Sequence, residues 1–187
     1  MERRALRGFT LVELLITIAI AVLLVTVAIP AFGSLVERQR AWLVLNDLRT
    51  GLHLAREYAA RHGTHATICR SADARQCGNG ADWAAGWMVF EDPDAQHDCT
   101  ADASGHCGHG GRVLGTGGGM RGGVRLSGNF FIQESVRYRE QGFAKAANGT
   151  FTACNRDGEI LGGLVVAWSG RVRPAEDGDN LACLPPA

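Results

Sequence analysis

The chain has 187 residues, a formal net charge of zero and 46% hydrophobic residues. This length accommodates one short anchor and one globular domain of roughly 120–150 residues. The overall charge favours no particular partner, but charge is clustered along the chain. Seven acidic residues and one arginine lie between Asp73 and Asp102, whereas nine basic and four acidic residues lie between Arg112 and Arg173.

An apolar run follows Arg3, Arg4 and Arg7 and extends from Phe9 to Ile29. As a helix, its 21 residues span roughly 31 Å, which matches the ~30 Å hydrocarbon core of a bilayer. The arginines are expected to remain on the cytoplasmic side. Residues 9–30 are therefore predicted to form a transmembrane or filament-core helix.

Glu13 interrupts the apolar run. A carboxylate in the membrane costs about 2–3 kcal/mol or more near the bilayer centre, so it is expected to have a partner and a function. The alternative is that Glu13 lies near the interface and extends towards the head groups.

The segment Gly8-Phe9-Thr10-Leu11-Val12-Glu13-Leu14-Leu15 resembles the start of type IV pilin-like proteins. The resemblance implies that residues 1–8 form a leader, which a prepilin peptidase removes between Gly8 and Phe9, and that Phe9 is then N-methylated. It also implies that the new amino group pairs with Glu13 of a neighbouring subunit during filament assembly.

An ordinary secretory signal peptide with a cleavage site at Ala31-Phe32-Gly33 is the competing interpretation. The apolar run is longer than the 7–15 residues of a typical signal peptide. The chain also continues as an amphipathic helix, which favours the pilin-like interpretation.

The helix is predicted to continue to His62, with a bend near Pro30 and Gly63 as its C-cap. Residues 31–63 form the amphipathic half. Their apolar stripe has the three- and four-residue spacing of a half-buried helix and comprises Ala41, Leu45, Leu48, Leu52, Ala55 and Ala59.

Residues 64–187 are predicted to form a β-rich domain, because short apolar runs alternate there with glycine, asparagine and aspartate. The candidate strands are Ala66–Arg70, Gly86–Phe90, Arg112–Leu114, Val124–Leu126, Ser135–Arg139, Thr150–Cys154, Leu164–Trp168 and Arg171–Arg173. The predicted fold is α+β, with the long N-terminal helix packed on antiparallel sheets.

Six cysteines behind a membrane anchor indicate an oxidising compartment. They allow 15 connectivities, of which we expect nearest-neighbour pairing: Cys69 with Cys77, Cys99 with Cys107, and Cys154 with Cys183. The alternative for one loop is a zinc site formed by His97, Cys99, His106, Cys107 and His109. Their spacing fits no standard zinc finger, so a disulfide-bonded surface loop is preferred, and no metal or cofactor is expected.

No catalytic motif is recognisable, and we expect no enzymatic activity. Trp83 and Trp87 lie four residues apart, and we expect them to pack in the core rather than stack on nucleic-acid bases.

Later motifs resemble the GspH/FimT-type minor pilins and pseudopilins. They are Cys69-Arg70-Ser71-Ala72-Asp73, Trp83 with Gly86-Trp87-Met88-Val89-Phe90-Glu91-Asp92, and Gly170-Arg171-Val172-Arg173. With the N-terminal segment, the resemblance covers nearly the whole chain, although not the Asp94–Gly111 insertion or the Ala175–Ala187 tail.

Arg171 and Arg173 carry the most specific chemistry. Two residues apart on a strand, they are expected to face the same side and to present two guanidinium groups to phosphate oxygens. Glu176, Asp177 and Asp179 follow and are expected to weaken the positive field. Further basic residues expected to widen the patch are Arg112, Arg121, Arg125, Arg137, Arg139, Lys145 and Arg156. The alternative is that these side chains are solvated or contact other subunits.

In FimT-type minor pilins a Gly-Arg-x-Arg element is associated with DNA capture in natural transformation, and Gly170 to Arg173 match it. The sequence therefore predicts a minor pilin of a type IV pilus that binds DNA without sequence specificity. Its expected location is the bacterial inner membrane, crossed once with the N-terminus in the cytoplasm, and then a filament in the periplasm or at the cell surface. The alternative is a structural tip pseudopilin of a type II secretion system.

Overall fold

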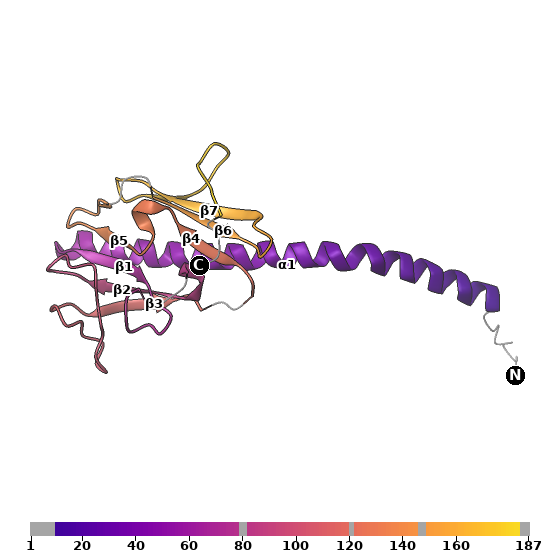
Figure 1. Ribbon diagram of the computed structural model, residues 1–187, viewed down its shortest axis with the longest axis horizontal. Coiled ribbons are helices and arrows are strands. Elements are labelled where there is room, and N and C mark those ends of the chain that lie inside the picture. Colours follow the sequence, from indigo (N-terminus) through magenta and orange to yellow (C-terminus); the bar gives the residue numbers. More distant parts are fainter. Residues whose placement is uncertain (1–9, 79–81, 120–121, 146–148, 184–187) are drawn as a thin grey trace, which may run out of the picture. The chain divides into compact units, whose positions relative to one another are not determined.

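A computed structural model describes residues 10–78, 82–119, 122–145 and 149–183, without the side chains of residues 27–31. The chain divides into two compact units, Met1–Val36 and Glu37–Ala187. Helix α1 (Leu11–His62) has 52 residues and contributes to both units (Figure 1). Its assignment is unbroken at Pro30, and the bend expected there stays a prediction.

In the N-terminal unit, Thr10 caps the start of α1. Its N–H and its hydroxyl each donate to Glu13 Oε2 at 3.5 Å, and the Glu13 N–H donates to Thr10 Oγ1 at 3.3 Å. This reciprocal pattern is a capping box, which supplies acceptors to the unpaired donors of the first turn. From Leu11 to Val25 the large apolar side chains are more than half exposed. Among the described residues, no helix is both long and apolar enough to cross a membrane.

In the globular unit, α1 packs on the sheets through one stripe. The buried residues are Ala41, Val44, Leu48, Leu52, Ala55 and Ala59. The predicted spacing is confirmed, with Val44 in place of Leu45, which is only partly buried. The helix ends as predicted at Gly63, which has a φ of 61° and donates its N–H to Ala59 O at 3.0 Å.

Two antiparallel four-stranded sheets complete this unit, and Figure 1 shows their strands grouped around the second half of α1. The first has the order β3–β2–β1–β5, from β1 (Ala66–Arg70), β2 (Trp87–Glu91), β3 (Val113–Gly117) and β5 (Ser135–Tyr138). The second has the order β4–β6–β7–β8, from β4 (Arg125–Gly128), β6 (Gly149–Cys154), β7 (Ile160–Val166) and β8 (Val172–Pro174). Short 3-10 turns occupy Trp83–Ala85 and Phe130–Ile132. The predicted α+β fold is confirmed, and each predicted strand is present: Ala66–Arg70 has the predicted bounds, and the others have shifted ends.

Both tryptophans of the Trp83/Trp87 pair belong to the core. Trp83 is 1% exposed, meets Phe151 edge-to-face and donates Nε1–H to Gln133 O at 3.1 Å. Trp87 is 5% exposed and donates to Asp47 Oδ2 at 3.0 Å. Neither is available for stacking on bases.

The three disulfides have the predicted connectivity: Cys69–Cys77, Cys99–Cys107 and Cys154–Cys183. Cys69–Cys77 closes a loop that begins in β1, and Cys99–Cys107 closes a loop within the Asp94–Gly111 insertion. The third joins the end of β6 to the C-terminal tail, so the tail is held against the second sheet.

Candidate nucleic-acid interface

The turn between β7 and β8 positions the arginine pair. The Ala167 N–H donates to Arg171 O at 2.9 Å, and the Gly170 N–H donates to Ala167 O at 2.8 Å. Gly170 has a φ of 77°, and a Cβ there would lie 1.9 Å from Gly142 O. Only glycine satisfies both the backbone conformation and this close approach. In the Gly-Arg-x-Arg element the glycine is therefore a structural requirement of the turn.

Strand β8 is the edge strand of the second sheet, and its side chains alternate as predicted. Val172 is 4% exposed and pairs with Val166 of β7, whereas Arg171 is exposed and Arg173 is partly exposed. The two arginines flank a buried valine, the arrangement that an extended chain gives to residues two apart. Arg171 lies just before β8, and the presentation of two adjacent guanidinium groups stays a prediction.

Arg173 is engaged by the C-terminal tail. Its Nη1 and Nη2 donate to Asp179 Oδ2 and Oδ1 at 2.7 and 2.8 Å. The hydrogen bonds from Arg173 lower the pKa of Asp179 to about 2, and the pKa of Arg173 is raised by the same pairing. This two-point pairing is the geometry in which a guanidinium also binds phosphate. Asp179 therefore occupies the donors that a phosphate would use.

The tail is held in this position by several contacts. The Glu176 N–H donates to Asp179 Oδ2 at 2.7 Å, and the Ala182 N–H donates to Thr152 Oγ1 at 3.3 Å. The Cys154–Cys183 disulfide fixes its end. The expected opposition between tail acids and arginines therefore acts mainly through Asp179.

Arg56 of α1 joins two loops beside this turn. Its Nε donates to Gly142 O at 3.2 Å and its Nη2 to Ser169 O at 3.3 Å. The Ala144 N–H donates to Trp168 O at 3.0 Å. These bonds hold the loop after β5 against the β7–β8 turn. Arg56 lies outside the predicted apolar stripe, and no local sequence signal reveals this role.

The loop joined to the β7–β8 turn carries two further predicted basic residues. Arg139 and Lys145 are exposed on the loop after β5, where the Arg139 N–H donates to Phe143 O and the Lys145 N–H donates to Arg137 O, both at 2.9 Å. Glu140 is exposed on the same loop and partly offsets their charge.

Arg137 must be removed from the predicted patch. It is 7% exposed, and its Nη1 donates to Ala95 O at 2.9 Å. Burial lowers the pKa of Arg137, and the neighbouring Asp92 opposes that effect. Arg137 lies on the face of β5 opposite the core residues Val136 and Tyr138, and the loop that follows β2 covers it there.

The remaining basic residues of the predicted patch lie away from the β7–β8 turn or outside the described residues. Arg112 precedes β3, at the other edge of the first sheet from β5. Arg125 pairs in register with Cys154, and Arg156 approaches Gly123, so both lie at the end of the second sheet away from the β7–β8 turn. Arg121 lies outside the described residues. The predicted broad patch is therefore divided: Arg171 and Arg173 remain adjacent, and Arg139 and Lys145 lie on the neighbouring loop, where their charges act on Arg137 and His97.

The histidine–cysteine loop does not form the alternative zinc site. Cys99 and Cys107 are bonded to each other, and among the described residues no group of three or more potential metal ligands gathers. Burial, followed by the charge of Arg137, lowers the pKa of His97.

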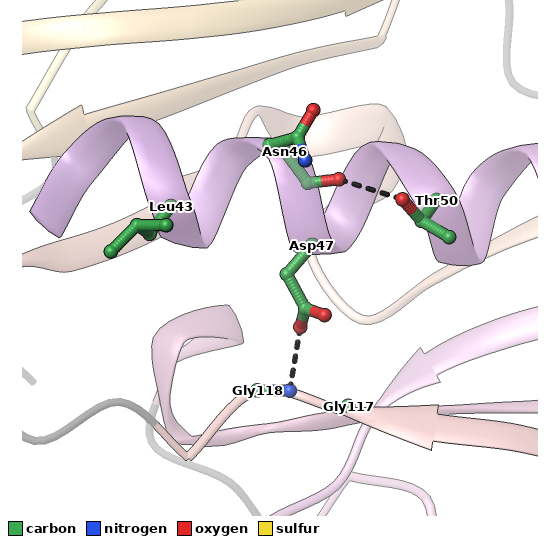
Figure 2. A pocket seen from close by; sticks show the side chains of 6 residues that line it. All are labelled: Leu43, Asn46, Asp47, Thr50, Gly117 and Gly118. Atoms are coloured by element: carbon green, nitrogen blue, oxygen red, sulfur yellow. Dashed lines mark hydrogen bonds between the residues drawn. The ribbon is translucent and has the colours of Figure 1, made fainter. Parts of the chain in front are cut away.

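A shallow pocket lies between α1 and the end of β3, and Figure 2 shows its lining residues: Leu43, Asn46, Asp47, Thr50, Gly117 and Gly118. Its carboxylate is already committed, because Asp47 Oδ2 accepts from the Gly118 N–H at 2.7 Å and from Trp87 Nε1 at 3.0 Å. These bonds give Asp47 a structural role in attaching α1 to the first sheet.

Comparison with known proteins identifies the family. A prokaryotic N-terminal methylation motif matches residues 3–29, and the family described as Type II transport protein GspH matches residues 44–170. The chain belongs to the GspH family. Arg171 and Arg173 lie just beyond the matched region. Gly8 and Phe9, the predicted cleavage and methylation positions, lie outside the described residues.

Solved structures agree with this fold. Two crystal forms of the Pseudomonas aeruginosa type IV minor pilin FimU give TM-scores of 0.56 and 0.53 at 19% and 18% identity. They cover 79% and 76% of this chain, and 98% and 99% of FimU. The Vibrio cholerae type 2 secretion minor pseudopilin EpsH gives a TM-score of 0.44 at 12% identity, covering 74% of this chain and 98% of EpsH. No curated protein matches the chain.

Proposed function

We propose that this GspH-family protein is a minor pilin of a type IV pilus and binds DNA through the surface around Arg171. The observation that carries the proposal is the exposed Arg171 beside Arg173, with Arg139 and Lys145 on the adjoining loop. Within the described residues, the Arg171 side chain has no hydrogen bond or ion pair. It is thus available to a phosphate without breaking an existing contact. Contacts to phosphates confer affinity without sequence specificity.

Arg173 has a secondary role in this proposal. A phosphate reaches its guanidinium only by sharing or displacing the Asp179 carboxylate, which already holds both terminal nitrogens. Arg171 is therefore the principal contact, and Arg173 contributes less than a free arginine would. No metal, cofactor or enzymatic activity forms part of the proposed function.

The N-terminal unit supports assembly in the same proposal. Before assembly, residues 9–30 anchor the subunit in the inner membrane as a single pass, and a prepilin peptidase removes the leader before Phe9. In the isolated chain Glu13 already caps its own helix through Thr10. Exchanging this weak 3.5 Å contact for the charged amino terminus of a neighbouring pilin subunit would satisfy the Glu13 carboxylate in the filament.

The test is the binding of fluorescently labelled duplex DNA to the full-length chain in non-ionic detergent, followed by anisotropy at several salt concentrations. Arg171→Ala removes one phosphate contact, so it should weaken binding to all sequences and lower the slope of log K against log salt by about 0.9. Arg156→Ala is the matched control, because Arg156 is an exposed arginine at the other end of the sheet. It should leave the slope nearly unchanged.

A structural pseudopilin of a type II secretion system is the second candidate, favoured by the matching family. This candidate predicts no DNA binding by the wild-type chain even at low salt. Deletion of the gene would then abolish protein secretion and leave DNA uptake intact. If the wild-type chain binds DNA and Arg171→Ala binds it as tightly as the Arg156→Ala control does, the surface around Arg171 is not the DNA site.

A further inference from the structure

Two aromatic side chains lie exposed and parallel beside the basic residues. Phe143 and Trp168 stack with ring centroids 5.3 Å apart and an interplanar angle of 9°. Trp168 is 61% exposed and Phe143 is 39% exposed. By contrast, Trp83 and Trp87 are buried and hydrogen-bonded in the core. The Phe143–Trp168 pair therefore leaves a large apolar ring surface in contact with solvent.

The loops that carry these rings are held together by the backbone. The Ala144 N–H donates to Trp168 O at 3.0 Å, and the Arg56 guanidinium on α1 donates hydrogen bonds to Gly142 O and Ser169 O. Three contacts from α1 and between the loops thus fix the positions from which the rings project. A pair positioned in this way is better ordered for stacking than isolated aromatic residues on free loops.

Arg171 accompanies Trp168 in its turn, and the loop of Phe143 also carries basic residues. Trp168 and Arg171 belong to one turn, closed by the bond from the Ala167 N–H to Arg171 O at 2.9 Å. Phe143 lies between Arg139 and Lys145 on the other loop, which also carries Glu140. An aromatic surface bordered by cations fits a ligand that combines a flat ring with phosphate groups. Proteins that bind single strands combine these two features.

We propose that Phe143 and Trp168 form a stacking platform for an unpaired base of a DNA strand whose phosphates contact Arg171. This inference rests on the proposed DNA-binding function and assigns that site a preference for single-stranded DNA or strand ends. In an intact duplex each base is stacked between its neighbours, so its faces do not reach a protein platform. The arginines bind either form, whereas the platform distinguishes between them.

The test measures anisotropy of three labelled ligands with the full-length chain in non-ionic detergent. They are an oligothymidylate, an abasic strand with the same number of phosphates, and a blunt duplex. Trp168→Leu keeps an apolar side chain at the turn but removes the indole. It should weaken oligothymidylate binding by about tenfold, within the range measured for stacked bases, and leave the abasic strand and the duplex unchanged. Trp168→Phe should retain most of the affinity.

Phe131→Ala is the matched control, because Phe131 is also 61% exposed but lies on the turn between β4 and β5. It should bind all three ligands like the wild type. Intrinsic fluorescence gives a second readout: oligothymidylate should quench the wild-type emission, and the quenching should be largely lost in Trp168→Phe although that variant still binds.

The outcomes separate the platform from the DNA function. If Trp168→Leu binds oligothymidylate like the wild type while Arg171→Ala weakens it, the platform is refuted and DNA binding stands. Equal weakening of all three ligands would mean that Trp168 only supports the turn, which also refutes the platform. Failure of the wild-type chain to bind any ligand refutes both. Loss of filament incorporation by Trp168→Leu with normal oligothymidylate binding would assign the rings to a subunit contact instead.

Discussion

Releasing Arg173 from Asp179 is predicted to strengthen DNA binding. Asp179→Asn removes the negative charge that holds both terminal nitrogens of the guanidinium at 2.7 and 2.8 Å. The asparagine still offers an oxygen to the Glu176 N–H, which donates to Asp179 at 2.7 Å in the wild type. The tail turn should therefore persist, and the main change is the freed guanidinium.

The expected magnitude follows from counterion release. A free arginine that neutralises one phosphate adds about 0.9 to the magnitude of the slope of log K against log salt. Asp179→Asn should therefore steepen the slope by as much as about 0.9 and tighten binding most strongly at low salt. Anisotropy titrations of labelled DNA from roughly 50 to 200 mM salt cover the range in which such slopes are measured.

Two comparisons test the reasoning. Asp177→Asn removes an exposed acid of the same tail that forms no ion pair with Arg173 among the described residues, so it should change the slope much less. In an Arg173→Ala background, Asp179→Asn should lose most of its effect. Unchanged affinity and slope in Asp179→Asn would refute the claim that Asp179 competes with phosphate.

The Asp179 effect should not depend on pH near neutrality. Because pairing lowers the pKa of Asp179 to about 2, the ion pair is fully formed above the ordinary aspartate value of about 3.9. Its contribution is lost only as the pH falls through about 2. The affinity ratio of Asp179→Asn to wild type should thus be the same at about pH 5 and about pH 8, and a change across that range would contradict the assignment.

Three further predictions concern assembly and stability. Glu13→Ala should still lose its leader but fail to enter filaments, whereas Glu13→Asp should be partly tolerated; immunoblots of whole cells and sheared filaments check this, and normal incorporation of the alanine variant would refute the pairing role. The entropy of loop closure predicts that double alanine substitution of Cys154 and Cys183 destabilises the domain by about 3.6 kcal/mol, and that of Cys69 and Cys77 by about 2.6 kcal/mol. Urea unfolding measures both losses, and a larger loss for the Cys69–Cys77 variant would contradict the prediction. Gly170→Ala should lower the free energy of unfolding by more than the ~1–3 kcal/mol of backbone strain alone, because its Cβ meets a carbonyl oxygen, whereas Gly178→Ala, with a φ of 101° and open space around it, should show only the strain; equal losses would refute the clash.

The sequence by itself determined the features that depend on local order. The three- and four-residue spacing of apolar side chains predicted the buried face of α1, and Gly63 marked its end, because a helix repeats every 3.6 residues. Nearest-neighbour cysteine pairing was correct for all three disulfides, two of which close short loops that keep the partners close. Strand geometry alone also predicts that Arg171 and Arg173 share a face. The T-x-x-E pattern of Thr10 and Glu13 is another local signal, and it corresponds to the capping box at the start of α1.

Only the tertiary structure decided which charged groups are available. Arg137 is buried, whereas Arg139, two residues later, is exposed. The strand β5 ends between them, and the loop that follows β2 covers Arg137 but not Arg139. Asp179 was one of several tail acids until the fold of the tail placed it on Arg173. Phe143 and Trp168 are 25 residues apart and meet because Arg56 joins their loops. Such pairings depend on contacts between distant segments, for which the chain has no local periodicity, and so they emerge only when the sheets and the helix pack together.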